Sequence, residues 1–271
     1  MRRIAVLIVI AVGALVGAPV TSQAVPTPPP PRSMAAIGDS MTQAADVCCW
    51  YGDHPANSWS TGGAGWDGVL SHYERIRAAN PDIAGRNYND SVSGARMDDG
   101  PGQAARAVQQ RASYVTILLG ANDLCTSSPE NMTSVEAFRS DYQATLQTLF
   151  QGLPRRAAVF VASIPDVHQL WEVFHGDPVA EFVWDVADIC QSLLSTARTD
   201  ADRQLVRQRN IAFNQVLADE CATYSRCRFD GNAVFETEFT RSDVSTLDYF
   251  HPSLTGQARL ASITWGATWW G

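Results

Sequence analysis

Short apolar runs that alternate with helical segments most constrain the fold of this chain. Residues 114–119 (YVTILL) and 157–164 (AAVFVASI) are apolar and rich in β-branched side chains, which predicts buried strands. Residues 33–37 and 86–89 are shorter strand candidates. Helical spacing covers residues 66–79, 98–112, 134–150, 179–195, 200–223 and 253–268. Because apolar strands that alternate with helices form a parallel sheet covered on both faces, we expect one α/β domain.

The N-terminal residues have the pattern of a secretory signal peptide. Arg2 and Arg3 precede an apolar run over residues 4–16, and small residues follow up to Ala24. A membrane anchor is the alternative, but the run is shorter than the roughly 20 residues of a spanning helix. We therefore expect a signal peptide over residues 1–24, a Pro-rich linker over 25–32, a domain over 33–271, and an extracellular protein.

The charge of the chain excludes one class of partner. The formal net charge is −8, and removal of Arg2 and Arg3 with the signal peptide would make it −10. Nucleic-acid binding depends on basic side chains that neutralise phosphates, so we expect no nucleic-acid partner. We also expect no stable membrane insertion of the mature chain, and a monomer.

The six cysteines fit an oxidising compartment, but the sequence does not determine their pairing. Cys221 and Cys227 are close enough to close a small loop, and Cys125 could reach Cys190. That would leave the adjacent Cys48 and Cys49, which would form a vicinal bridge or stay free. A zinc site is the weaker interpretation, because the sequence has no C-x-x-C pair near a second such pair or near paired histidines.

A serine and an acid–histidine pair suggest nucleophilic catalysis. Ser40 directly follows the first predicted strand, and a serine hydroxyl attacks only when a base accepts its proton. Asp248 and His251 are three residues apart, a spacing that lets the carboxylate hold one ring nitrogen while the other faces Ser40. A turn serine and a surface Asp–His pair are the structural alternatives.

Two further residues are candidate oxyanion donors. The backbone N–H of Gly94 can approach a developing alkoxide closely, and the amide of Asn122 can donate without adding charge. The N–H of Ser40 would be a third donor. Because Ser40 and Asn122 both follow predicted strands, and functional groups gather at the carboxyl ends of parallel strands, we expect them to share one site.

These segments together resemble a known family. Gly38-Asp39-Ser40, Gly94, Gly120-Ala121-Asn122-Asp123 and Asp248-Tyr249-Phe250-His251-Pro252 are similar to the sequence blocks of the SGNH (GDSL) hydrolases. Residues 59–62 and 116–123 resemble its secreted actinobacterial branch in particular. The chain departs from the pattern at Met41, which stands in place of Leu, and at Cys48-Cys49 and His54, where related secreted proteins have a spaced cysteine pair.

The resemblance implies a flavodoxin-like three-layer α/β/α sandwich around a central parallel sheet, and ester hydrolysis without a metal or other cofactor. It also implies the roles of the site residues. Ser40 would be the nucleophile, His251 the base and Asp248 the residue that orients it, with Ser40, Gly94 and Asn122 forming the oxyanion hole.

The leading hypothesis is therefore a secreted serine esterase or lipase that acts on a small-molecule or lipid ester through an acyl-enzyme. A lipase needs an apolar acyl channel, whereas a carbohydrate O-acetylesterase needs a shallow polar cleft. Two other classes remain open, a non-catalytic binding protein and a metal-dependent phosphoesterase with Asp39, Asp123, Asp248 and His251 as ligands. Aromatic residues that could line a channel or belong to the core are Trp50, Tyr51, Trp59 and Trp66; His168 and His175 flank Trp171 in a segment that could border the pocket.

Overall fold

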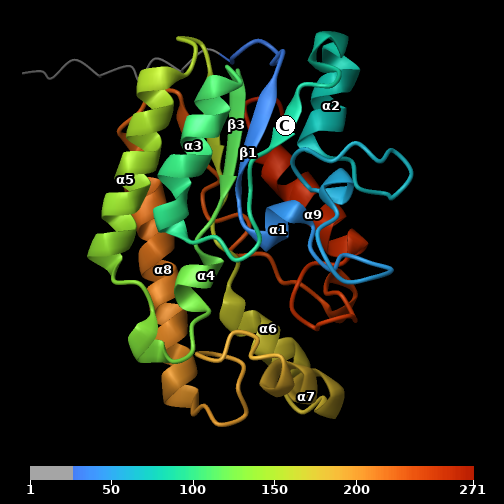
Figure 1. The fold of residues 1–271 in the computed structure, drawn as a ribbon, viewed down its shortest axis with the longest axis vertical. Coiled ribbons are helices and arrows are strands. Elements are labelled where there is room, and N and C mark those ends of the chain that lie inside the picture. The colour runs from blue at the N-terminus through green and yellow to red at the C-terminus, as the bar shows by residue number, and fades with distance from the viewer. Residues whose placement is uncertain (1–26) are drawn as a thin grey trace, which may run out of the picture.

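A parallel five-stranded sheet forms the centre of the structure, which is a computed structural model that describes residues 27–271 (Figure 1). The predicted signal peptide and residues 25 and 26 of the linker lie outside the described residues. The strands are β1 (Met34–Gly38), β2 (Asn87–Asn89), β3 (Tyr114–Leu118), β4 (Ala158–Val161) and β5 (Cys227–Phe229). All pairings are parallel, so the expected sheet class is confirmed.

The strand order β2-β1-β3-β4-β5 is that of a flavodoxin-like doubly wound sheet. The chain moves from β1 outward to β2 and then returns to place β3 on the other side of β1. The order therefore reverses between β1 and β3, and ligands of such sheets bind outside the carboxyl ends of the strands at this point. Loops from β1 and β3 meet there.

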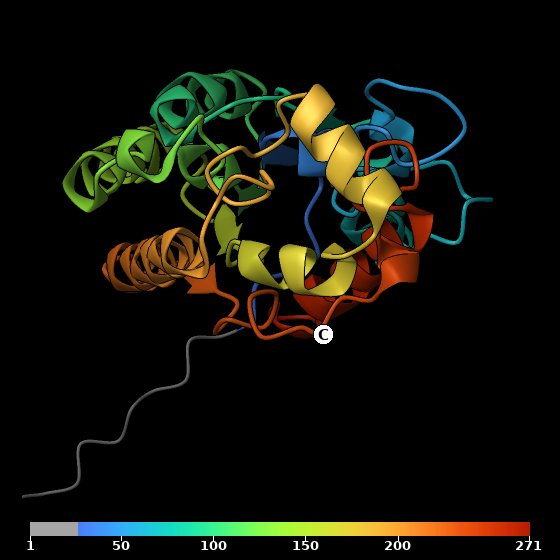
Figure 2. The same ribbon diagram turned by 90° about the horizontal axis from the view of Figure 1, so that it is seen from below.

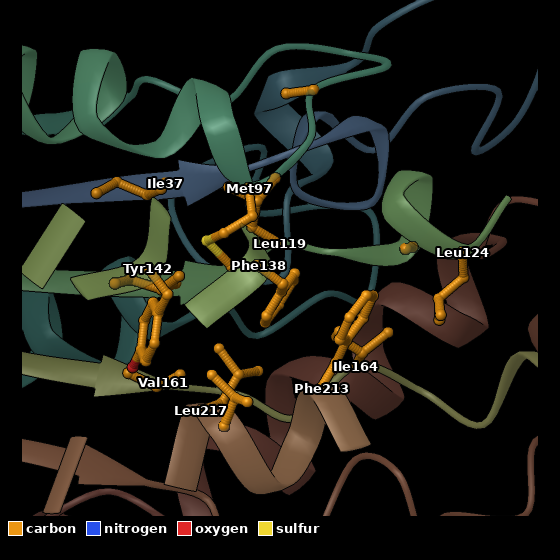
Figure 3. Close-up of a cluster of buried hydrophobic side chains, with 14 of the residues drawn as sticks. Ile37, Met97, Leu119, Leu124, Phe138, Tyr142, Val161, Ile164, Phe213 and Leu217 are labelled. Carbon is orange, nitrogen blue, oxygen red and sulfur yellow. The ribbon is translucent and has the colours of Figure 1, made fainter. Parts of the chain in front are cut away.

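Helices cover both faces of the sheet, as expected for a three-layer sandwich (Figure 1). One face packs against α3 (Gly100–Gln109), α5 (Val135–Gly152) and α8 (Asp200–Ala222), and the other against α2 (His72–Ala79) and α9 (Leu254–Gly266). Alternate strand residues point to opposite sides. Ile37 and Val161 join the core with Phe138 and Phe213 on the first face (Figure 3), and Phe160 belongs to the second.

The remaining helices lie at the carboxyl edge of the sheet. The short helices α1 (Ser40–Gln43) and α4 (Ala121–Leu124) follow β1 and β3 directly. The helices α6 (Val167–Phe174) and α7 (Pro178–Val186) follow β4 and project beyond this edge, as Figures 1 and 2 show. Among residues 27–271 we find no helix with the length and apolar composition needed to cross a membrane.

Several element boundaries differ from those expected. The helix expected over residues 66–79 begins only at His72, because Gly68 has a positive φ of 82° and Ser71 forms a capping box with Glu74. The helix expected over residues 179–195 ends at Val186, since Asp188 and Cys190 have left-handed backbones. Neither α6 nor β5 was predicted. Both are short, although the apolar residues Val167, Leu170, Trp171 and Phe174 of α6 have the spacing of a helix.

The described part of the Pro-rich linker, residues 27–32, has no helix or strand. Hydrogen bonds nevertheless hold it to the domain. The side-chain amide of Asn80 donates to the carbonyl of Pro31 at 2.9 Å, and the indole N–H of Trp270 donates to that of Pro28 at 2.7 Å. The stretch therefore lies along the domain surface.

Candidate active site

Ser40 lies at the tight junction between β1 and α1. The carboxylate of Asp39 caps α1 by accepting the N–H of Met41 at 2.9 Å, which fixes Ser40 as the first helical residue. Gly38 is required immediately before, because a Cβ there would lie 2.4 Å from Oγ1 of Thr42. The Ser40 side chain is therefore held at the carboxyl end of β1, at the reversal point of the sheet.

The segment that follows residue 244 brings a carboxylate and an imidazole to this serine. Nε2 of His251 lies 2.8 Å from Oγ of Ser40, and Nδ1 lies 2.5 Å from Oδ2 of Asp248. The other oxygen of Asp248 accepts the backbone N–H groups of Phe250 and His251 at 2.9 and 3.1 Å. Tyr249 has a φ of 57°, a left-handed conformation that closes this turn. The three side chains thus form a continuous hydrogen-bonded chain.

The electrostatics around these three side chains favour a carboxylate at Asp248 and a basic imidazole at His251. Burial alone would lower the pKa of His251, but the hydrogen bond and charge of Asp248, with the charges of Asp46 and Asp39, raise it above its usual value. Burial would raise the pKa of Asp248, yet the contact with His251 and two backbone N–H groups hold it below its usual range. A proton leaving Ser40 would therefore rest on the histidine.

The two candidate oxyanion donors lie on neighbouring loops. Asn122, in α4, lines the same pocket as Ser40 and His251, and its Nδ2 donates to the carbonyl of Ala95 at 2.9 Å. Gly94 directly precedes Ala95, is exposed and has a φ of 83°. Among residues 27–271, no acceptor takes the backbone N–H of Ser40 or Gly94. Both N–H groups are therefore available to a ligand.

Asp123 holds these two loops together. Its carboxylate accepts the N–H of Met97 at 2.9 Å and the hydroxyl of Thr133 at 2.7 Å. Burial raises the pKa of Asp123 to about 6 despite these bonds. The carboxylate thereby fixes the loop of Gly94 against α4, so it has a positioning role between the two proposed donors.

An apolar pocket opens beside the serine, with a volume of about 90 Å³. Helix α6 contributes Val167, Leu170 and Val173 to its wall. The segment before His251 contributes Phe239, Val244 and Phe250. The segment around Trp171 was expected as a possible border of the pocket, and it does line it, but the helix itself and its apolar lining residues were not predicted.

Asp46 is the second feature that sequence reasoning missed. Its Oδ2 lies 3.8 Å from Nδ1 of His251, so the imidazole faces two carboxylates. Oδ1 of Asp46 accepts the N–H of Gly52 at 2.6 Å, and its carbonyl accepts the hydroxyl of Ser245 at 2.5 Å. Burial and the neighbouring charge of Asp248 raise the pKa of Asp46, although the Gly52 N–H opposes them. No motif marks this residue, which reaches the site through loop packing.

The metal-ligand set considered for a phosphoesterase is not assembled. Among the residues described, the potential ligand group at the site consists of Asp46, Asp248 and His251, whose ligand atoms lie within 4.8 Å of one another. Asp39 and Asp123 are not part of this group. Asp39 instead caps α1, and Asp123 joins the two loops that carry the candidate oxyanion donors.

The other histidines have separate environments. His72 is fully buried, lies 2.9 Å from the hydroxyl of Tyr114 and 2.8 Å from that of Thr264, and burial lowers its pKa to about 3. His168 lies in the first turn of α6 and His175 directly follows the helix, but neither lines the pocket beside Ser40. These side chains therefore take no part in the serine site.

The aromatic residues considered as pocket lining lie elsewhere. Trp59 is fully buried in the core, whereas Trp50, Tyr51 and Trp66 have exposed fractions of 66%, 70% and 77%. None of them lines the pocket beside Ser40. Of the two alternatives, the core is correct for Trp59, and neither is correct for Trp50, Tyr51 and Trp66.

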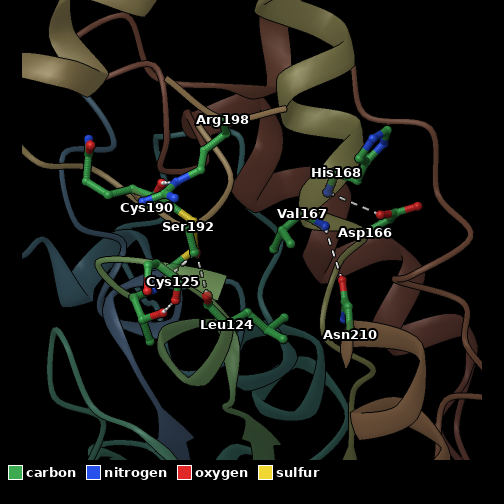
Figure 4. The surroundings of a disulfide bond; sticks show 12 residues. Leu124, Cys125, Asp166, Val167, His168, Cys190, Ser192, Arg198 and Asn210 are labelled. Atoms are coloured by element: carbon green, nitrogen blue, oxygen red, sulfur yellow. Dashed lines mark hydrogen bonds between the residues drawn. A yellow bond between two sulfur atoms is a disulfide. The ribbon is translucent and has the colours of Figure 1, made fainter. Parts of the chain in front are cut away.

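Two disulfides hold the chain outside the serine site. Cys125–Cys190 joins the end of α4 to the loop after α7, where Ser192 also donates to the carbonyl of Leu124 at 2.6 Å (Figure 4). Cys221–Cys227 joins the end of α8 to β5. The possible bridge between Cys48 and Cys49 is not formed, because their sulfurs are 2.7 Å apart, longer than the roughly 2.05 Å of a bond.

Comparison with known proteins finds one matching family model and similar curated proteins. The model of the GDSL-like Lipase/Acylhydrolase family matches residues 36–259. "Phospholipase B1, membrane-associated" of Rattus norvegicus is 24% identical over 221 residues, which are 68% of this chain but 15% of that protein. The mouse protein of the same name is 25% identical over 211 residues, 66% of this chain and 14% of its own length. The chain thus spans about one seventh of these relatives.

Solved structures resemble the fold at low sequence identity. LAE5, an alpha/beta hydrolase enzyme from the metagenome of Lake Arreo, has a TM-score of 0.55 at 15% identity, covering 87% of this chain and 94% of its own. An acetyl xylan esterase from Geobacillus stearothermophilus has a TM-score of 0.50 at 16% identity, covering 87% and 93%.

Proposed function

The chain belongs to the GDSL-like lipase/acylhydrolase family, and from this premise we propose that it is a serine ester hydrolase with Ser40, His251 and Asp248 as its catalytic triad. The observation that carries the proposal is the hydrogen-bonded chain from Ser40 through His251 to Asp248, with distances of 2.8 and 2.5 Å. Nucleophile, base and orienting acid need this geometry.

The reaction proceeds through an acyl-enzyme. His251 accepts the proton of Ser40 as its Oγ bonds to the ester carbonyl carbon, and the carbonyl oxygen becomes an oxyanion. The N–H groups of Ser40 and Gly94 and the amide of Asn122 stabilise this charge. The intermediate then breaks the bond to the alcohol, which leaves with the proton from His251. Water, deprotonated by His251, attacks the acyl-enzyme and releases the acid and Ser40.

The decisive variant is Ser40→Ala. We expect loss of turnover of 4-nitrophenyl acetate with an unchanged circular dichroism spectrum, because only the nucleophilic oxygen is removed. Ser225→Ala is the matched control, since Ser225 is exposed and takes no part in the site. A fluorophosphonate probe should label the wild type and the control but not Ser40→Ala. Wild-type activity in Ser40→Ala would refute the proposed nucleophile.

The pocket lining favours an acyl group longer than acetyl. Val167, Leu170, Val173 and Phe250 present apolar surface beside Ser40, where a hydrocarbon chain would gain burial. A series of 4-nitrophenyl esters from acetate to laurate tests this directly. A maximum of kcat/KM at a medium or long chain supports an esterase or lipase. Activity confined to acetate would instead support a carbohydrate O-acetylesterase of the same fold.

Two other classes are separated by simple controls. The cluster of Asp46, Asp248 and His251 could hold a metal ion, so a metal-dependent phosphoesterase is the second candidate. Our proposal requires that a chelator leaves ester hydrolysis intact and that 4-nitrophenyl phosphate is not hydrolysed. A non-catalytic binding protein would show neither activity nor labelling by the probe.

Export, domain organisation and monomeric state belong to the same proposal. The disulfides Cys125–Cys190 and Cys221–Cys227 are compatible with an oxidising compartment. N-terminal sequencing of protein recovered from the medium should begin after Ala24, with a domain over residues 33–271. Light scattering should give the mass of a monomer.

A further inference from the structure

Helix α7 carries an apolar face that no described part of the chain covers. Val179, Phe182 and Val186 have exposed fractions of 53%, 66% and 67%, and their spacing places them on one side of the helix. Ala180 and Trp184 are buried on the other side. The helix is therefore held to the domain by one face and presents a second apolar face to solvent.

A second exposed apolar group lies in the loop after α1. Trp50 and Tyr51 have exposed fractions of 66% and 70%. Side chains of this kind, with an apolar body and a polar edge, are enriched where proteins meet the lipid–water interface. We call Trp50, Tyr51, Val179, Phe182 and Val186 together the apolar rim.

The two elements that carry the rim lie on either side of residues 247–251, which include Asp248 and His251. The hydroxyl of Tyr51 donates to the carbonyl of Leu247 at 3.0 Å. From the other side, the indole N–H of Trp184 in α7 donates to the carbonyl of Tyr249 at 3.0 Å. Figures 1 and 2 both show the segment before His251 between the loop and α7. The two elements that carry the rim thus both contact the segment that holds Asp248 and His251.

The charges around α7 indicate which kind of surface the rim fits. Asp177 is paired with Arg241 at 2.8 Å, and the side chains of Glu181 and Asp185 accept internal hydrogen bonds from Gly176 and from Thr196. Neither α7 nor the loop of residues 46–53 contains an arginine or a lysine, and the chain has a net charge of −8. Anionic lipid attracts clusters of basic residues, which the rim lacks.

We propose that the apolar rim docks the enzyme on the surface of aggregated zwitterionic ester lipid, so that an acyl chain can pass from this surface into the pocket beside Ser40. The proposal rests on the proposed ester hydrolase function and names its substrate class, lipid in aggregated form. Burial of the rim in the interface supplies the binding energy, and α6 then meets the acyl chain.

Binding can be tested without catalysis. Ser40→Ala protein should float with phosphatidylcholine vesicles, and more strongly than with phosphatidylglycerol vesicles. Adding Phe182→Ser and Val186→Ser should weaken partitioning on the order of tenfold or more, because two apolar side chains no longer enter the interface. Ile211→Ser is the matched control: Ile211 has an exposed fraction of 46% on α8, away from the rim, and its loss should change nothing.

Activity gives the second readout. The rate on a phosphatidylcholine should rise as the lipid passes from dispersed molecules to aggregates. In an enzyme with Phe182→Ser and Val186→Ser, this rise should be lost relative to its own rate on a water-soluble aryl ester.

Failure of either proposal can be recognised separately. The docking proposal is overturned if vesicles do not bind Ser40→Ala protein, if the rim variant binds as well as its parent, or if anionic vesicles bind better. It is also overturned if the wild type is a dimer that the rim substitutions dissociate, because a second copy would then occupy this face. A wild-type protein that binds vesicles but hydrolyses no ester would instead refute the proposed function.

Discussion

The second carboxylate beside His251 should set the pH range of activity. Asp46→Asn removes its charge and little else, because an asparagine oxygen can still accept the N–H of Gly52 that holds the loop. The pair of Asp248 and His251 remains intact in this variant. We expect the pKa of His251 to fall, since one of the negative charges that raise it has been removed.

The size of the shift follows from the distance. At the 3.8 Å between Oδ2 of Asp46 and Nδ1 of His251, a pair of unit charges interacts by roughly 1 kcal/mol in water and roughly 4 kcal/mol at an effective dielectric constant of 20. The lower part of this range applies, because solvent reaches both side chains, which are 15% and 16% exposed, and screens the interaction. About 1.4 kcal/mol corresponds to one pKa unit.

The measurement is the pH profile of kcat/KM on a water-soluble ester, which reports groups of the free enzyme. His251 must be neutral to accept the proton of Ser40, so activity falls on the acid side. Asp46→Asn should move this acid limb about one unit lower. Asp82→Asn is the matched control, since the Asp82 side chain is 65% exposed and contacts Arg32 before β2. An acid limb that stays in place, or moves upward, would refute the reasoning.

Three further outcomes are expected. Asn122→Ala should lower kcat by roughly 10²–10³, measured on the same ester, because one oxyanion donor is lost. Gly94→Ala should reduce the free energy of unfolding by about 1 kcal/mol in a urea titration, since its φ of 83° disfavours a side chain although no atom lies within 4 Å of the added Cβ. His72→Gln should destabilise the protein at pH 7. Because the folded pKa of about 3 lies below the unfolded value of 6.5, the unfolded wild type binds an extra proton between them, so its stability advantage over His72→Gln should shrink by about 1.4 kcal/mol per unit as the pH falls through this window.

The sequence located candidate site residues best where a residue of catalytic type follows a predicted strand. Ser40 and Asn122 could be assigned to one edge of a parallel sheet because the apolar strands before them are strong signals. The local spacing of Asp248 and His251 likewise anticipated their contact, since a turn of three residues brings these side chains together. In each case the relevant interaction is local, or follows from the rules of parallel sheets.

The features that were not predicted depend on contacts between residues that are far apart in the chain. Asp46 meets His251 only because Ser245 donates to its carbonyl, a contact between residues 199 positions apart. The pocket wall from α6 depends on how that helix leaves β4. The spacing of Val167, Leu170, Trp171 and Phe174 fits a helix, but it does not show which side chains face the pocket. Such contacts leave no pattern in the sequence of a single chain.

The position of His251 depends on these same unmarked contacts. Its partner Ser40 is 211 positions away in the chain, so the turn around Asp248 can orient the imidazole but cannot bring it to the serine. The loop after α1 holds this segment through Asp46, and α7 holds it through the indole of Trp184. The elements that place the base are therefore the ones that carry the apolar rim. If the rim meets a lipid surface, the lipid contacts the same elements that set the distance between base and nucleophile. Recognition of the substrate and placement of the base therefore depend on the loop after α1 and on α7.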